Sequence, residues 1–136
     1  MLAGVLLAVL LVPDEKSHPV GWRDLSAQAE SVRTADSVRR LFRTREQLVR
    51  FLGTKERVPP IDFSKRQLLL VAPGPRSSTG YSVEVLSVSE REGRITVKVR
   101  ERTPKLGDRV EARVTYPFRL LSLPAGRDVY VDWVGR

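Results

Sequence analysis

The sequence predicts a mainly β domain of the α+β class, in which an antiparallel sheet forms a sandwich or a partly closed barrel and one short helix covers it. Three observations favour this fold class. Apolar and polar residues alternate in short segments of the second half of the chain, as in strands with one solvated face. Turn signals separate these segments. Only residues 44–53 combine helical apolar spacing with helix end signals.

The predicted helix begins after Thr44, a residue type that caps helix N-termini well. Gln47 stands three residues further on and could complete a capping box, and Gly53 is a natural C-terminal stop. The apolar residues at helical spacing are Leu48, Phe51 and Leu52. A helix this short is not stable alone, so we expect it to pack on the sheet.

Seven segments have the length and composition of strands. They are residues 37–42, 67–72, 81–88, 94–101, 109–115, 118–123 and 128–134. The segment 67–72 is apolar almost throughout, which favours a buried strand. The segments 81–88 and 94–101 flank a turn at residues 90–93 and form a predicted hairpin. In 109–115 the expected inward residues are Val110, Ala112 and Val114.

The N-terminal residues 1–12 form an unbroken apolar run after Met1. The run is too short to span a bilayer but has the length of the apolar core of a signal peptide. We therefore expect an export signal or N-terminal anchor at 1–12, a linker at 13–19 and a single globular domain at 20–136. A buried N-terminal strand or helix is the alternative. The expected location is secreted or in the cell envelope.

The residue composition limits the chemistry. With no Cys in 136 residues, disulfides, zinc-thiolate sites and thiol catalysis are excluded. The one His, His18, falls in the predicted linker and makes a poor general base. Calcium-loop and phosphate-loop motifs are absent from the sequence. We therefore assign no catalytic residue, no metal site and no cofactor, and expect a protein that is not an enzyme.

The net charge of +8 invites a nucleic-acid or anionic partner. The basic residues are spread along the chain rather than gathered into one run, which favours an ordinary solvated surface and argues against nucleic acid. One alternative remains open. Arg94, Lys98 and Arg100 could stand beside Arg109 and Arg113 if their strands pair, which would give an anion-binding sheet face.

The segment 72–81, APGPRSSTGY, is an unusual loop between two predicted strands. Its prolines stiffen the backbone, and Gly74 and Gly80 permit backbone angles closed to other residues. A rigid polar loop loses little entropy on binding, so it is a candidate recognition element. The alternative is a structural turn with Tyr81 buried. With a second Pro-aromatic site after residue 115, the candidate partner-binding residues are Arg76, Ser78, Thr79, Gly80, Tyr81, Tyr116 and Pro117.

Five short features follow one another along residues 60–123: Ile61-Asp62-Phe63-Ser64, the apolar strand 68–71, Ser78-Thr79-Gly80-Tyr81-Ser82-Val83, Thr103-Pro104 with Gly107, and Thr115-Tyr116-Pro117-Phe118. With these features, the segment resembles the C-terminal domain of the PrcB family of protease-complex subunits. The resemblance implies a non-catalytic protein that binds a protein partner such as a secreted protease, and that assembles or stabilises an extracellular or envelope complex. A membrane contact is expected only through the N-terminal apolar segment.

A second, weaker resemblance concerns the loop alone. Thr79-Gly80-Tyr81 is similar to part of a loop of chagasin-type inhibitors of cysteine proteases, and Pro117-Phe118 loosely resembles another element of that family. This resemblance implies protease inhibition as an alternative function.

Overall fold

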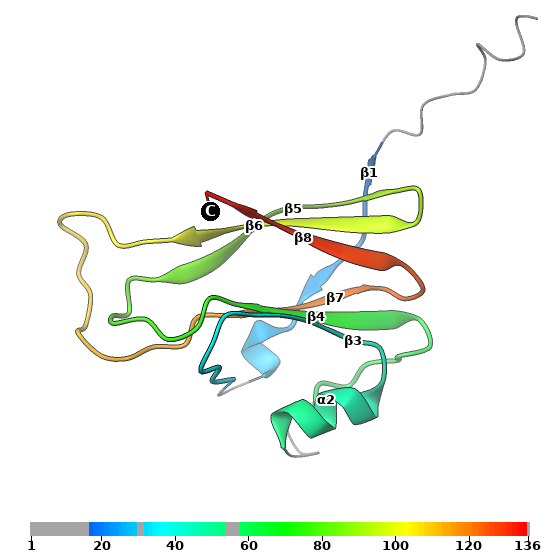
Figure 1. Cartoon of the computed structure of the whole chain (residues 1–136), viewed down its shortest axis with the longest axis horizontal. Coiled ribbons are helices and arrows are strands. Elements are labelled where there is room, and N and C mark those ends of the chain that lie inside the picture. Colours follow the sequence, from blue (N-terminus) through cyan, green and yellow to red (C-terminus); the bar gives the residue numbers. More distant parts are fainter. Residues whose placement is uncertain (1–16, 30–31, 54–57, 136) are drawn as a thin grey trace, which may run out of the picture.

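The computed structural model describes residues 17–29, 32–53 and 58–135. Two four-stranded sheets lie face to face (Figure 1). The first sheet has the order β1 (His18–Pro19), β5 (Ser82–Arg91), β6 (Arg94–Arg102) and β8 (Asp128–Val134). The second has the order β2 (Arg23–Asp24), β7 (Arg119–Pro124), β4 (Arg66–Ala72) and β3 (Val38–Phe42). The predicted mainly β fold is confirmed, in its sandwich form.

The main hydrophobic core lies between the two sheets. On β6 its residues alternate with polar residues on the outer face, and the other main strands likewise contribute mostly alternate side chains. The buried members are Leu69, Val71, Val83, Val88, Ile95, Val97, Val99, Leu121, Leu123, Val131 and Trp133. The predicted inward face of residues 94–101 is thus confirmed.

A second core covers the outer face of the β4 sheet. The helix α2 (Arg45–Leu52) and the N-terminal segment that contains the short helix η1 (Ser26–Gln28) pack there. Its buried members are Leu25, Ala29, Val32, Phe42, Leu48, Leu68, Leu70 and Leu120. Strand β4 is therefore buried on both faces, which explains why residues 67–72 show no polar alternation.

The end signals of α2 work as the sequence predicts. The Thr44 hydroxyl accepts a hydrogen bond from the backbone N–H of Gln47 at 3.2 Å, and Gly53 ends the helix with a φ of 74°. The Gln47 side chain accepts from the backbone N–H of Arg43 at 2.8 Å, one residue before the usual capping-box partner. Leu48 is buried against the sheet, so packing stabilises the short helix.

One strand pair departs from the antiparallel expectation. Strands β6 and β8 pair in parallel, whereas all other strand pairs in the described residues are antiparallel. The intervening strand β7 lies in the opposite sheet and pairs with β4. Because the chain reverses once on entering β7 and again on leaving it, β8 returns beside β6 in the same direction (Figure 1).

The predicted strand at residues 109–115 is wrong. This stretch has no ladder, only an isolated bridge at Thr115, and Val110 and Val114 are 42% and 60% exposed. Ala112 is exposed as well. The segment carries the chain from one sheet to the other, so it cannot run alongside either sheet. Its alternating valines lack the partner strand that would bury them.

The predicted N-terminal boundaries are tested only in part. The expected export segment 1–12, and the linker up to residue 16, lie outside the described residues. The linker was expected to reach residue 19, but His18 and Pro19 pair with β5 as strand β1. No helix in the described part of the chain is long and apolar enough to cross a membrane.

Glu90 on β5 joins three parts of the fold and gives it a predicted pH dependence. Its carboxylate accepts from Arg127 Nε at 2.8 Å and lies 3.4 Å from His18 Nε2. The Arg127 hydrogen bond is the main cause that lowers the pKa of Glu90. The ionised carboxylate therefore stabilises the fold above the ordinary glutamate pKa, and this stabilisation is lost as the pH falls through the lowered pKa.

We predict that Glu90→Gln lowers the midpoint of urea unfolding at pH 7 and makes stability fall less steeply with acidification. The matched control is Glu92→Gln, because Glu92 lies in the adjacent turn and contacts no basic side chain of the described residues within 4.0 Å. Urea titrations at a series of pH values measure both effects. Parallel pH profiles for Glu90→Gln and the unsubstituted protein would contradict the role of this carboxylate.

Candidate partner-binding site

Two loops meet at one end of the sandwich. Residues 73–81 connect β4 to β5, and residues 103–118 connect β6 to β7. Each loop crosses from one sheet to the other, and both lie at the same end of the molecule in Figure 1. The two sequence segments that were singled out as candidate contact elements are therefore neighbours in space.

Backbone hydrogen bonds join the two loops. Arg76 and Thr115 exchange two backbone bonds, both at 2.9 Å. The backbone N–H of Thr79 donates to the Glu111 carbonyl at 3.1 Å, and the Thr115 hydroxyl donates to the Ser78 carbonyl at 2.7 Å. The loop 73–81 is therefore held by its neighbour rather than standing alone. This arrangement fixes the loop before any partner binds.

The side chain of Arg76 fastens the loop to the β6 end of the first sheet. Its Nε and Nη2 atoms donate to the two carboxylate oxygens of Glu101 at 2.9 and 3.1 Å. The Arg76 and Glu101 side chains are only 24% and 14% exposed, so solvent screens this bidentate pair less than a surface pair. The guanidinium also lies 6.0 Å from the centre of the Tyr81 ring. Arg76 thus orients Tyr81 as well as the backbone.

Gly80 is required for space rather than for backbone angles. Gly74 has a φ of 95°, as its predicted role demands, but Gly80 does not have a positive φ. A Cβ atom on Gly80 would lie 2.6 Å from Pro104 Cβ and 2.7 Å from Val110 Cγ1. The expected conformational role of Gly80 is therefore corrected. Its missing side chain lets the loop 103–118 pack directly on the loop 73–81.

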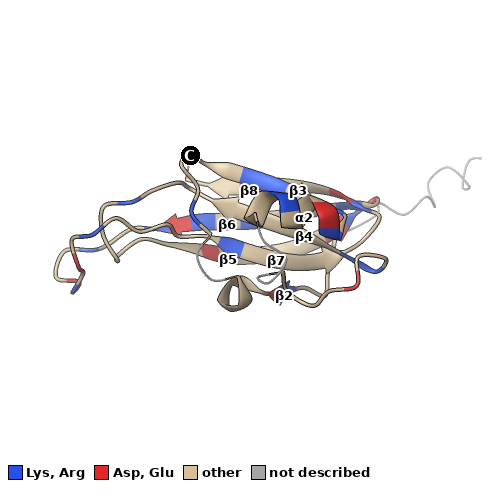
Figure 2. Cartoon of the chain, turned by 90° about the horizontal axis from the view of Figure 1, so that it is seen from below, with Lys and Arg blue, Asp and Glu red and all other residues tan. Residues whose placement is uncertain are grey.

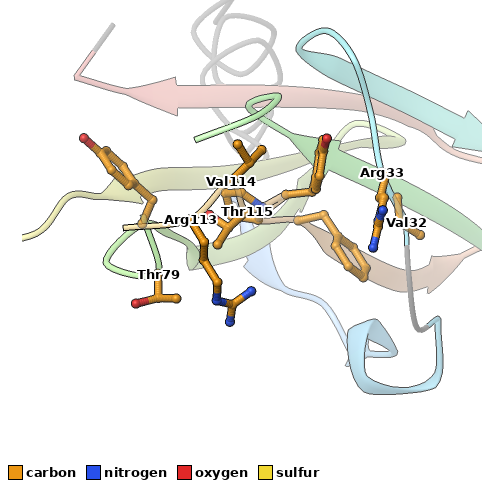
Figure 3. A pocket seen from close by; sticks show the side chains of 10 residues that line it. Val32, Arg33, Thr79, Arg113, Val114 and Thr115 are labelled. Atoms are coloured by element: carbon orange, nitrogen blue, oxygen red, sulfur yellow. The ribbon is translucent and has the colours of Figure 1, made fainter. Parts of the chain in front are cut away.

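An open groove of about 550 Å³ lies beside the joined loops. Figure 3 shows its lining side chains, with Thr79 and Arg33 at opposite sides and Arg113 between them. Its lining combines aromatic and aliphatic side chains with polar and cationic ones. Its lining residues are Val32, Arg33, Thr79, Tyr81, Arg113, Val114, Thr115, Tyr116, Pro117 and Phe118.

The structure divides the sequence-predicted contact residues into two groups. Four of them line the groove: Thr79, Tyr81, Tyr116 and Pro117. The other three hold the loops in place: Arg76, Ser78 and Gly80. Tyr81 is half-buried, between the exposed and the buried alternatives considered from the sequence.

Sequence reasoning missed the contribution of residues 32–33. The Arg33 guanidinium lies 5.7 Å from the centre of the Tyr116 ring, a cation–π arrangement. These residues are more than 80 positions apart in the chain, and no local pattern connects them.

The groove carries positive charge. Arg33 and Arg113 line it, and none of its lining residues is acidic. Arg113 is bonded to Glu111 at 2.9 Å, which partly offsets its charge. Arg33 has no carboxylate within 4.0 Å among the described residues. The groove thus combines stacking surfaces with a guanidinium, that of Arg33, for which the described residues supply no carboxylate partner.

The alternative anion-binding sheet face is weakened by the fold. Arg109 and Arg113 are not on a strand, so they do not extend the row formed by Arg94, Lys98 and Arg100. Arg100 is bonded to Glu84 on β5 at 2.7 Å. On the other side, Arg94 and Lys98 have Asp128 and Asp132 of β8 as their register partners. Figure 2 shows basic segments at both ends of the molecule and along the strands rather than in one patch.

In residues 17–29, 32–53 and 58–135, no three His, Cys, Asp or Glu side chains lie close enough together to hold a metal ion. His18 lies beside Glu90 of β5 and is not among the residues that line the groove.

Comparison with known proteins agrees with the sequence resemblance. The family model described as PrcB C-terminal matches residues 68–124, from β4 through β7. This match confirms that residues 68–124 resemble the PrcB C-terminal family. The matched domain belongs to a subunit type associated with a protease complex, not to a known catalytic family. Searches of curated proteins and of solved structures each gave no match.

The packing at Gly80 leads to a test of the joined loops. We predict that Gly80→Ala destabilises the fold by about 1–3 kcal/mol, because a methyl group there must displace Pro104 or Val110. Urea unfolding followed by circular dichroism measures the change. Gly21→Ala is the matched control, since Gly21 has no positive φ and no heavy atom within 4 Å of its added Cβ. Equal stability of the two variants would contradict the described contact between the loops.

Proposed function

We propose that this protein is an exported, non-catalytic protein-binding module that assembles or stabilises an extracellular or envelope protease complex. The groove between the joined loops is the proposed contact surface. The expected export through residues 1–12 is part of this proposal.

The composition of the groove is the observation that supports the proposal most. Tyr81, Tyr116 and Arg33 combine large ring surfaces with a planar cation, and Tyr and Arg are the residues that most often dominate binding energy at protein interfaces. The loops that carry the tyrosines are fixed by mutual hydrogen bonds, so little ordering entropy is lost on binding. The association of the PrcB family with a protease complex points to the kind of partner.

Protease inhibition receives less support from the geometry. A chagasin-like loop would have to enter the cleft of a protease. Here Gly80 is packed against Pro104 and Val110, and Ser78 is buried. Only Thr79 of the Ser78–Gly80 stretch is exposed. The loop therefore presents one edge of a groove rather than a free wedge.

The proposal predicts a specific loss of capture. Tagged protein is incubated with the secreted and envelope fractions of the source cells, and bound proteins are identified by mass spectrometry. We expect a protease component to be enriched, and Tyr116→Ala to reduce its recovery by about tenfold or more, as for an interface hot spot. The matched control is Tyr130→Ala, because Tyr130 is a 55% exposed tyrosine on β8, outside the groove.

Several outcomes would contradict this proposal. They are the absence of any enriched protease component, or equal losses with Tyr116→Ala and Tyr130→Ala in proteins that remain folded.

Salt dependence distinguishes binding through the groove from the anion-binding alternative. Capture through the groove should weaken modestly with salt, whereas binding through Arg94, Lys98 and Arg100 should weaken steeply and be lost when these residues are neutralised.

A further inference from the structure

A second pocket of about 540 Å³ lies on the outer face of the β4 sheet, away from the groove. It is bounded by β2, by the start of β4 and by the segment that leads into β4. Its lining residues are Gly21, Trp22, Arg23, Leu25, Pro60, Ile61, Asp62, Lys65, Arg66 and Ser122. It shares no lining residue with the groove.

Arg66 is the central cation of this pocket. It is half-buried, and its Nε and Nη2 atoms donate to the hydroxyl and carbonyl oxygens of Ser122 at 2.8 Å each. Nη2 also donates to the Gly21 carbonyl at 3.1 Å. These acceptors are all neutral, so they fix the guanidinium plane without compensating its charge. No hydrogen bond from Nη1 to a described residue accompanies them.

A second guanidinium stands close to the first. Arg23 of β2 pairs with Ser122 of β7, the residue that Arg66 of β4 binds, so the two arginines come from the strands on either side of β7. Burial, followed by repulsion from Arg23, lowers the pKa of Arg66. No carboxylate of the described residues lies within 4.0 Å of either side chain.

The rest of the lining leaves a positive excess. Arg23, Lys65 and Arg66 are cationic, and Asp62 is the one acidic lining residue. The lining side chains therefore carry a net charge of +2. The Asp62 carboxylate accepts from the backbone and the hydroxyl of Ser64 at 3.0 and 2.6 Å. The fold thus places the exposed Arg23 and Lys65 beside the half-buried Arg66, an arrangement that an anion with several oxygens would stabilise.

We propose that this pocket binds a phosphate group between Arg23 and Arg66. A phosphate dianion matches the excess of two positive charges and accepts hydrogen bonds on several sides, which suits two planar donors. Trp22 is 37% exposed and also lines the pocket, so it can contact the carbon skeleton that carries the phosphate. The phosphate could be free or part of a lipid headgroup, and the two sources are distinguished by the test.

Isothermal titration calorimetry with inorganic phosphate at constant ionic strength tests the site. We expect saturable one-site binding that Arg23→Gln weakens by about tenfold or more, as for loss of a charge-assisted contact. Arg23 is exposed and no side-chain hydrogen bond of it is seen in the described residues, so this variant should fold. Lys98→Gln is the matched control because Lys98 is an exposed cation on the other sheet, and it should change the affinity less than about twofold.

Two further measurements complete the test. Vesicles of phosphatidic acid in phosphatidylcholine should bind the protein if the phosphate belongs to a lipid, and free phosphate should then compete; binding of free phosphate alone assigns a soluble ligand. Tyr116→Ala should bind phosphate with unchanged affinity, so the phosphate site is tested independently of the groove. Absence of saturable binding, or equal affinities for Arg23→Gln and Lys98→Gln, would overturn the proposal.

Discussion

The burial of strand β4 on both faces is the constraint on which the rest of the structure depends. Six consecutive residues of this strand, 67–72, are buried, so each face needs its own cover. The β5–β6–β8 sheet covers one face, and α2 with the N-terminal segment covers the other. Hydrogen bonding to β3 and β7 completes the strand on both edges. The chain must therefore cross repeatedly between layers, and the crossings create the loops at the end of the sandwich.

The groove follows from these crossings. A loop that joins two sheets cannot satisfy its backbone within a ladder, so its polar groups need other partners. Here the two crossing loops supply partners for each other through the Arg76–Thr115 pair, and the Arg76–Glu101 ion pair fastens them to β6. Fixed loops with aromatic side chains provide a preorganised surface. The same physical need that stabilises the fold thus produces the candidate contact site.

Local sequence patterns predicted much of the secondary structure, but they could not predict contacts between segments that are distant in the chain. The helix 45–52 and the strands around Ile95 and Trp133 were predictable from the spacing of their apolar residues, and the strand around Leu69 from its unbroken apolar run. Residues 109–115 show the same alternation without a strand, because spacing does not state whether a partner strand is available. The role of Gly80 and the contact of Arg33 with Tyr116 depend on segments distant in the chain, which no single stretch records.

The parallel pairing of β6 and β8 has a consequence for the order of assembly. Strand β8 carries Val131 and Trp133 into the central core, beside Val97 and Val99 of β6. A chain emerging from the ribosome therefore leaves one edge of its first sheet uncovered until residues 128–134 are available. The core can close stably only after nearly all of the described sequence has been synthesised. We therefore expect folding during synthesis to occur in one late step rather than in several.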